Sequence, residues 1–171
     1  IACTGYTGNE IFDLHYLPYL YENYEHFFEV FRGEIGRNWE ERQVNEMGLR
    51  VLDAAYAGFG VVTSRRAFTT PEETRRLKIR LMQMPVILDT WDAIGANPTP
   101  MAWTEVFSAL QAGVIDAQEN PVALAKSEHF YEVTDYLVKT HHSLHAMFVQ
   151  ISEPVWQRMS PEVQEVFRDT L

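Results

Sequence analysis

The feature that most constrains the fold of this chain is an alternation of short strand and helix patterns after residue 48. Leu49–Tyr56 is largely apolar and indicates a strand. In Leu77–Met82 apolar residues alternate with Lys78, Arg80 and Met82, and this period of two predicts a strand with Arg80 on the face opposite Ile79. Helix patterns follow at Pro85–Ile94 and over roughly Trp103–Ala112. The order strand, helix, strand, helix, strand predicts an α/β fold with mainly parallel strand pairing.

Local signals place several element boundaries. Thr70 is followed by Pro71 and Glu73, so Thr70 is expected to cap a short helix, with Pro71 in its first turn and Glu73 closing a capping box. Gly48 is expected to end the preceding helix in a left-handed conformation. The other predicted elements are helices at Tyr24–Phe31, Gly36–Met47, from Pro121 onward and from Ser160 to Leu171, and strands at Val114–Asp116 and Leu144–Ile151.

Composition and charge exclude several classes of partner. The 171 residues include 24 acidic and 14 basic side chains, and the resulting net charge of -10 repels nucleic acid and anionic lipid. No apolar run is long enough to span a bilayer, so we expect no direct membrane insertion. Hydrophobic residues make up 46% of the chain, enough for a packed core. If the protein binds an acid, a local arginine must act against the global negative charge.

Neither the single cysteine nor the histidines predict a reactive or metal site. Cys3 cannot form an internal disulfide, and no helix start or neighbouring histidine activates it, so we expect a buried, inert thiol. His141, His142 and His145, together with His129, suggest a metal cluster, but no cysteine is near and acidic partners are expected only at a distance. We therefore expect a solvated or hinge-adjacent histidine cluster, with no metal and no other cofactor.

Motifs of common enzyme classes are absent from the sequence. It contains no dinucleotide-binding GxGxxG after a strand, no phosphate-binding loop and no GxSxG. Asp89, Asp92 and Asp116 could supply acid chemistry, yet each falls where a surface or capping carboxylate is expected. An α/β enzyme that acts on a carboxylate substrate is therefore the less favoured alternative, and we predict no catalytic residue.

Five segments resemble, in order, the DctP-type substrate-binding proteins of tripartite ATP-independent periplasmic (TRAP) transporters. This resemblance implies an α/β fold of the two-lobe periplasmic binding protein type II class, which closes on its ligand by a hinge. It also implies a periplasmic protein that captures a small organic acid for the membrane subunits of a TRAP transporter. A ligand-sensing domain of the same fold is an alternative that the sequence does not separate from this function. The segments are LPYLYENYEHFFEVFRGEIG (17–36), TPEETRRLKIR (70–80), LKIRLM (77–82), GANPTPMAWTEVFSALQAGVIDAQENP (95–121) and SEPVWQRMSPEVQEVF (152–167).

The resemblance also implies that the chain is a fragment. It opens without an initiator methionine or a signal pattern, and family members are longer at both ends. We expect the N-terminal part of the first lobe to be missing. Residues 1–57 would then form the end of the first lobe, residues 58–145 the second lobe, and residues 146–171 a hinge-crossing return segment to the first lobe.

The resemblance places the main ligand contact at Arg80. A planar guanidinium matches the two oxygens of a carboxylate in a fork that lysine cannot form. Spacing alone leaves open an arginine that pairs with a neighbouring glutamate or points to solvent. Asn120, in AQENP, is implied to hydrogen-bond the same carboxylate, although an asparagine before Pro121 is also typical of a turn.

Three further residues are weaker candidates for ligand contacts. Trp103 lies where the family has an aromatic ring over the ligand, and its alternative is a core tryptophan. Glu119 is a candidate for contacts with substrate hydroxyls or for bracing Arg80. Gln83, just after the arginine strand, is a candidate that could reach the ligand.

One departure from the family pattern concerns a second arginine. Many members have the sequence GFR where this chain has Gly58-Phe59-Gly60. We expect the second cationic contact to be missing, or to be supplied by Arg65 or Arg66. This departure favours an acid other than sialic acid.

Overall fold

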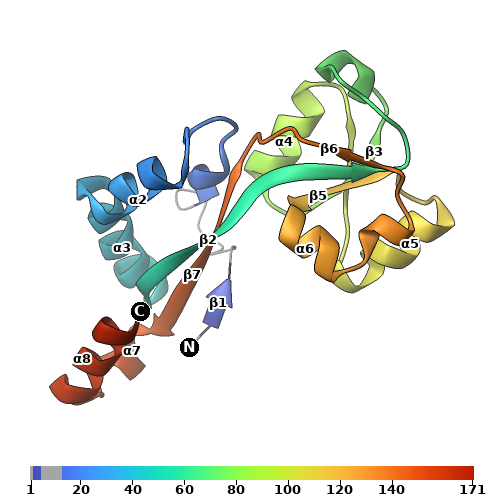
Figure 1. The fold of residues 1–171 in the computed structure, drawn as a ribbon. Coiled ribbons are helices and arrows are strands. Elements are labelled where there is room, and N and C mark those ends of the chain that lie inside the picture. Colours follow the sequence, from blue (N-terminus) through green and yellow to red (C-terminus); the bar gives the residue numbers. More distant parts are fainter. Residues whose placement is uncertain (1, 5–12) are drawn as a thin grey trace. The chain divides into compact units, whose positions relative to one another are not determined.

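The computed structural model describes residues 2–4 and 13–171 of the chain (Figure 1). The described chain divides into two compact units, the first formed by residues 2–4, 21–56 and 146–171, and the second by residues 13–20 and 57–145. Strands β2 (Leu49–Ser64) and β7 (Leu144–Ser152) each contribute residues to both units. Residues 13–20 group with the second unit, whereas the predicted boundaries had assigned them to the first lobe.

The second unit is built on a mixed sheet with the strand order β6-β2-β5-β3-β4. Strand β3 is parallel to β4 and β5, whereas β2 is antiparallel to both β5 and β6. Parallel neighbours need a crossover connection, and the links from β3 to β4 and from β4 to β5 each contain a helix. The predicted parallel pairing is therefore confirmed around β3 and wrong for β2. The bounds are β3 (Lys78–Leu81), β4 (Asn97–Pro100), β5 (Ala117–Pro121) and β6 (Tyr136–Val138).

Helices cover both faces of this sheet, as Figure 1 shows for α4 on one face and for α5 and α6 on the other. Side chains of a strand alternate between the two faces, so β3 contributes Leu77, Ile79 and Leu81 to the core under α4. Arg80 lies on the opposite face, as predicted, where it contacts Trp103 beside the α5 core. The helices are α4 (Pro85–Ala93), α5 (Val106–Ala112) and α6 (Val122–Ser127), with 3-10 turns at Leu14–Tyr16, Pro71–Thr74, Trp103–Glu105 and Phe130–Glu132.

One predicted strand in this unit is wrong. Residues 114–116 form a link, and the strand begins at Ala117. Ile115 is fully buried among the side chains of the α5 core, so its apolar character serves helix packing and not a sheet. The backbone N–H of Lys78 donates to the Asp116 carboxylate at 3.0 Å, which fixes this link against the start of β3.

The first unit contains most of the remaining helices. Helix α3 ends at Gly48, whose φ of 65° is the predicted left-handed C-cap. Arg50 binds Glu153 through Nε at 2.6 Å and Nη2 at 3.0 Å, and its Nη1 donates to Glu40 at 2.8 Å. These contacts tie α3, β2 and α7 together. The bounds are β1 (Ala2–Thr4, antiparallel to β7), α2 (Tyr24–Arg32), α3 (Glu34–Met47), α7 (Glu153–Trp156) and α8 (Pro161–Thr170).

Two further sequence expectations concern the side chain of Cys3 and the absence of a membrane-spanning segment. Cys3 lies in β1, opposite Val149, but its side chain lies outside the described part of the chain. In that described part, no helix combines the length and the apolar character needed to cross a bilayer.

Candidate functional site

Arg80 is a buried cation that forms no ion pair with any described residue. Only 5% of the residue is exposed. Its Nε and Nη2 both donate to the Met101 carbonyl, at 3.1 and 3.0 Å, and its Cζ lies 5.2 Å from the centre of the Trp103 ring. Among residues 13–171, no carboxylate lies within ion-pair distance of the guanidinium. Arg80 is therefore neither solvated nor internally paired, the two alternatives that spacing left open.

The charge of Arg80 persists despite this burial. Loss of solvation lowers its pKa, and the negative charge of Glu119 acts in the opposite direction. A guanidinium nevertheless stays protonated at physiological pH. Burying a charge without a partner costs free energy, and a bound anion would recover it. The Met101 carbonyl occupies the edge formed by Nε and Nη2, and Nη1 makes no hydrogen bond with any described residue.

A row of hydrogen-bonded polar side chains lies on the Arg80 face of the sheet. Gln118 is opposite Arg80 in the β3–β5 register and is fully buried. Its Nε2 donates to Thr63 Oγ1 at 2.8 Å, and Asn120 Nδ2 donates to Gln118 Oε1 at 2.7 Å. Asn120 therefore lies inside β5 and not in a turn. The sequence prediction missed Gln118, although alternation from Asn120 places residue 118 on the same face.

Trp103 and Gln83 differ in how they relate to Arg80. Trp103 is half-buried and makes an edge contact with Phe130 at 5.6 Å between ring centres, while its face meets the guanidinium. It thus belongs partly to the α5 core and partly to the surroundings of Arg80. Gln83 is exposed in the turn between β3 and α4, and within the described chain it makes no hydrogen bond to Arg80, Trp103 or Asn120.

Glu119 lies among histidines rather than beside Arg80. Its Oε1 accepts a hydrogen bond from His145 Nε2 at 2.7 Å and lies 3.6 Å from His142 Nε2. Glu119 is 2% exposed, and His142 and His145 are 8% and 5% exposed. For His142 and His145 the expectations of solvated side chains and of distant acidic partners are therefore wrong, whereas His129 and His141 are exposed. Strand β2 pairs with β5 and also hydrogen-bonds the segment that leads into β7, so both of its neighbours contribute to the cluster. In the described chain, no three His, Cys, Asp or Glu side chains are grouped as metal ligands would be.

The buried groups in this cluster shift one another's protonation. Burial acts to raise the pKa of Glu119, but His145, His142 and Arg80 lower it, and the net direction is downward. Burial lowers the pKa of His142. Burial and the negative charge of Glu119 raise the pKa of Tyr16, whose ring makes an edge contact with His145. The cluster therefore favours an ionised Glu119 and a neutral His142 at neutral pH.

We expect stability to fall as the pH drops below the ordinary histidine pKa of 6.5, because His142 has a lowered pKa in the folded protein only. The unfolded chain then takes up the proton first, and the free energy of unfolding decreases by up to about 1.4 kcal/mol per pH unit until folded His142 titrates. Glu119 also makes the protein less stable as the pH falls, because its pKa is lowered in the folded state. Its contribution to stability is lost at a lower pH than that of His142. Urea unfolding at about pH 7.5, 6.5 and 5.5 should give a shallower pH dependence for His142→Gln than for the wild type. Equal slopes would contradict this assignment.

The structure leaves no room for a side chain at Gly60. A Cβ atom there would overlap Glu119 Oε1 and would lie 3.0 Å from both His142 Cε1 and Ser143 Oγ. A second arginine could not occupy this position in the present packing. Arg65 and Arg66, the two candidates to supply that contact, are both exposed, and Arg66 donates to backbone carbonyls of Glu73 and Arg75.

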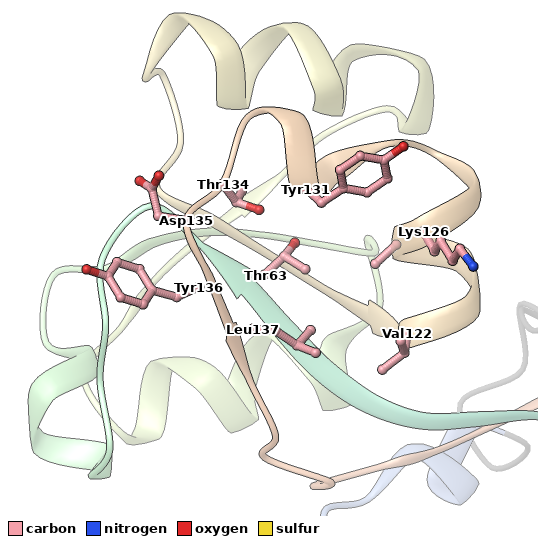
Figure 2. Close-up of a pocket in the computed structure, with 9 residues that line it drawn as sticks. Thr63, Val122, Lys126, Tyr131, Thr134, Asp135, Tyr136 and Leu137 are labelled. Carbon is pink, nitrogen blue, oxygen red and sulfur yellow. The ribbon is translucent and has the colours of Figure 1, made fainter.

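A separate pocket of about 400 Å³ lies on the α6 side of the sheet. Figure 2 shows Lys126, Tyr131 and Asp135 around it, with Thr63 at its inner wall. None of the five predicted site residues lines this pocket among the described residues. Thr63 connects this pocket to the polar row on the Arg80 face, because it accepts the hydrogen bond from Gln118.

Comparison with known proteins adds a family context to this geometry. The model of the DctP family, described as bacterial extracellular solute-binding protein, family 7, matches residues 3–171. A solute-binding protein of Roseobacter denitrificans is 39% identical over 148 residues, which are 86% of this chain and 46% of that protein. The sialic acid-binding periplasmic protein SiaP of Vibrio cholerae is 34% identical over 152 residues, 89% of this chain and 47% of SiaP.

A solved structure shares the fold. The TRAP periplasmic solute-binding protein of Roseobacter denitrificans with bound L-galactonate has a TM-score of 0.88 and 37% identity, over 93% of this chain and 53% of that one. The present chain therefore spans about half the length of the relatives that it matches.

Proposed function

The chain belongs to the DctP family of bacterial extracellular solute-binding proteins, and from this premise we propose that its protein binds a small organic acid in the periplasm and delivers it to the membrane subunits of a TRAP transporter. The proposed role is binding without chemical turnover. The named relatives are solute-binding proteins, and one of them has L-galactonate, a sugar acid, bound in its structure.

The single observation that carries this proposal is the unmatched buried charge of Arg80. A guanidinium fixed on a strand, with one edge on the Met101 carbonyl and one face on Trp103, can meet a carboxylate with little reorganisation. An internal carboxylate would have supported a structural role, but the described residues place none in ion-pair contact with Arg80. The ligand carboxylate is proposed to complete this ion pair.

The surrounding groups suit a hydroxylated acid with one carboxylate. Gln118 and Asn120 are buried amides on the Arg80 face, and amides can donate to or accept from hydroxyl groups. Gly60 leaves no space for a second cation, so a single guanidinium carries the charge recognition in this unit. We therefore propose a sugar acid such as an aldonate, and an acid other than sialic acid. The assignments of Glu119 and Gln83 as ligand contacts stay predictions with less geometric support.

A calorimetric panel on the intact protein tests this proposal. L-galactonate and D-erythronate are expected to bind at least about tenfold more tightly than the matched neutral alditols, because only the acids form a charge-assisted pair with Arg80. N-acetylneuraminate, added to the same panel, is expected not to bind. Equal affinity for an acid and its alditol would refute carboxylate recognition, and product formation from any acid would refute a pure binding role.

A further inference from the structure

The second unit contains a larger pocket on the face of the sheet opposite Arg80. It has a volume of about 620 Å³, and helix α4 contributes Trp91 and Ile94 to its lining. This volume lies within the range of small-molecule pockets. None of the five predicted site residues lines it among the described residues, so it is distinct from the site proposed above.

Buried rings give this pocket an apolar and rigid wall. Trp91 and Phe68 are 3% and 6% exposed and belong to the core under α4. The Trp91 ring also makes an edge contact with the His142 ring, at 5.3 Å between centres. Rings held by core packing offer a ligand a large contact area with little loss of conformational freedom.

The charge of this pocket is opposite to that of the chain. Its lining includes the ammonium group of Lys139, and none of the described lining residues is acidic. No carboxylate in the described chain forms an ion pair with Lys139. In a chain with a net charge of -10, a pocket with an unpaired ammonium group and no acid is a local site for an anion.

The rim of the pocket is held in an uncommon backbone conformation. Tyr19, which lines the pocket, has a φ of 58°, and His141, next to His142, has a φ of 47°. Bulky residues adopt this left-handed region only where the surrounding structure fixes them. The Tyr19 N–H donates to the His142 carbonyl at 2.7 Å and joins these two segments. This hydrogen bond holds the two segments of the rim together.

We propose that this pocket is a second binding site, which takes a small amphipathic monocarboxylate with an aromatic or aliphatic body. The body would pack against Trp91 and Phe68, and the carboxylate would pair with Lys139 at the mouth. This second site does not depend on Arg80. The second-site proposal can therefore fail while the proposed transport function holds, and the transport function can fail while the second site holds.

The test uses 3-phenylpropionate as the probe, with 3-phenylpropanamide as its neutral match, titrated into the intact protein by calorimetry. Lys139→Met is expected to weaken binding of the acid by about tenfold or more, because it removes the charged partner. Lys126→Met, in the pocket of Figure 2, and Arg80→Lys are expected to leave this affinity unchanged. Lys139 is exposed, so the variant is expected to fold, and its melting temperature checks this.

Three outcomes would overturn the proposal. Absence of binding by 3-phenylpropionate would remove the site. Equal binding of the amide would show that no anion is recognised. Loss of binding in Arg80→Lys, with Lys139→Met unaffected, would place the probe at Arg80 instead. A weaker affinity in Lys139→Met alone, with the amide binding poorly, is the result that supports the second site.

Discussion

Replacing Arg80 with lysine is expected to weaken binding of the acid ligand by about 100-fold while the protein stays folded. Lysine keeps the positive charge but loses the planar fork, so it cannot hold two carboxylate oxygens and the Met101 carbonyl together. It also removes the flat cation that lies against the Trp103 ring. Calorimetric titration of the tightest acid into both proteins measures the change.

Arg66→Lys is the matched control for this substitution. Arg66 is an exposed arginine of the same unit that binds backbone carbonyls, and its replacement is expected to leave the affinity unchanged. Melting temperatures of both variants without ligand separate lost binding from lost folding. Wild-type affinity in a folded Arg80→Lys protein would remove Arg80 from the site.

The second large effect is expected at Gly60, where alanine should lower the free energy of unfolding by about 2–3 kcal/mol. The new methyl group would overlap Glu119 Oε1, and that carboxylate cannot move easily because it is buried and bound to His145. Urea unfolding of the wild type and the variant gives the difference.

A double-mutant cycle identifies the cause of that penalty. If the clash with Glu119 is responsible, Gly60→Ala should cost much less in a Glu119→Ala background, because the carboxylate that it meets is gone. The same penalty in both backgrounds would show that the strain at Gly60 arises elsewhere. The Glu119→Ala protein alone serves as the reference for the lost His145 contact.

Elements with strong local signals were predictable from the sequence. The capping box at Thr70, the glycine that ends α3 and the period-two strand of Arg80 all depend on neighbours in the chain, and each is present in the structure. The face of Arg80 followed from alternation alone. The family resemblance was also confirmed, whereas the lobe boundaries and the ligand contacts stay predictions.

The features that the sequence did not predict depend on pairing between distant segments. Glu119 and His145 are 26 positions apart and lie 2.7 Å from each other because β5 and β7 are both neighbours of β2 in the sheet. The antiparallel direction of β2 likewise depends on its entry from the other unit, which no local pattern encodes. Ile115 was predicted to lie in a strand, but its side chain packs in the α5 core. A short apolar segment after a turn is compatible with either environment, so the sequence alone does not distinguish them.

The most direct measurement is a crystal structure of the intact protein with the tightest-binding acid of the panel. A buried guanidinium without a protein anion should then hold both carboxylate oxygens of the ligand at about 2.7–2.9 Å, the usual length of such charge-assisted hydrogen bonds. The contrary result is a ligand whose carboxylate lies away from Arg80, with that side chain still bound only to Met101 and Trp103.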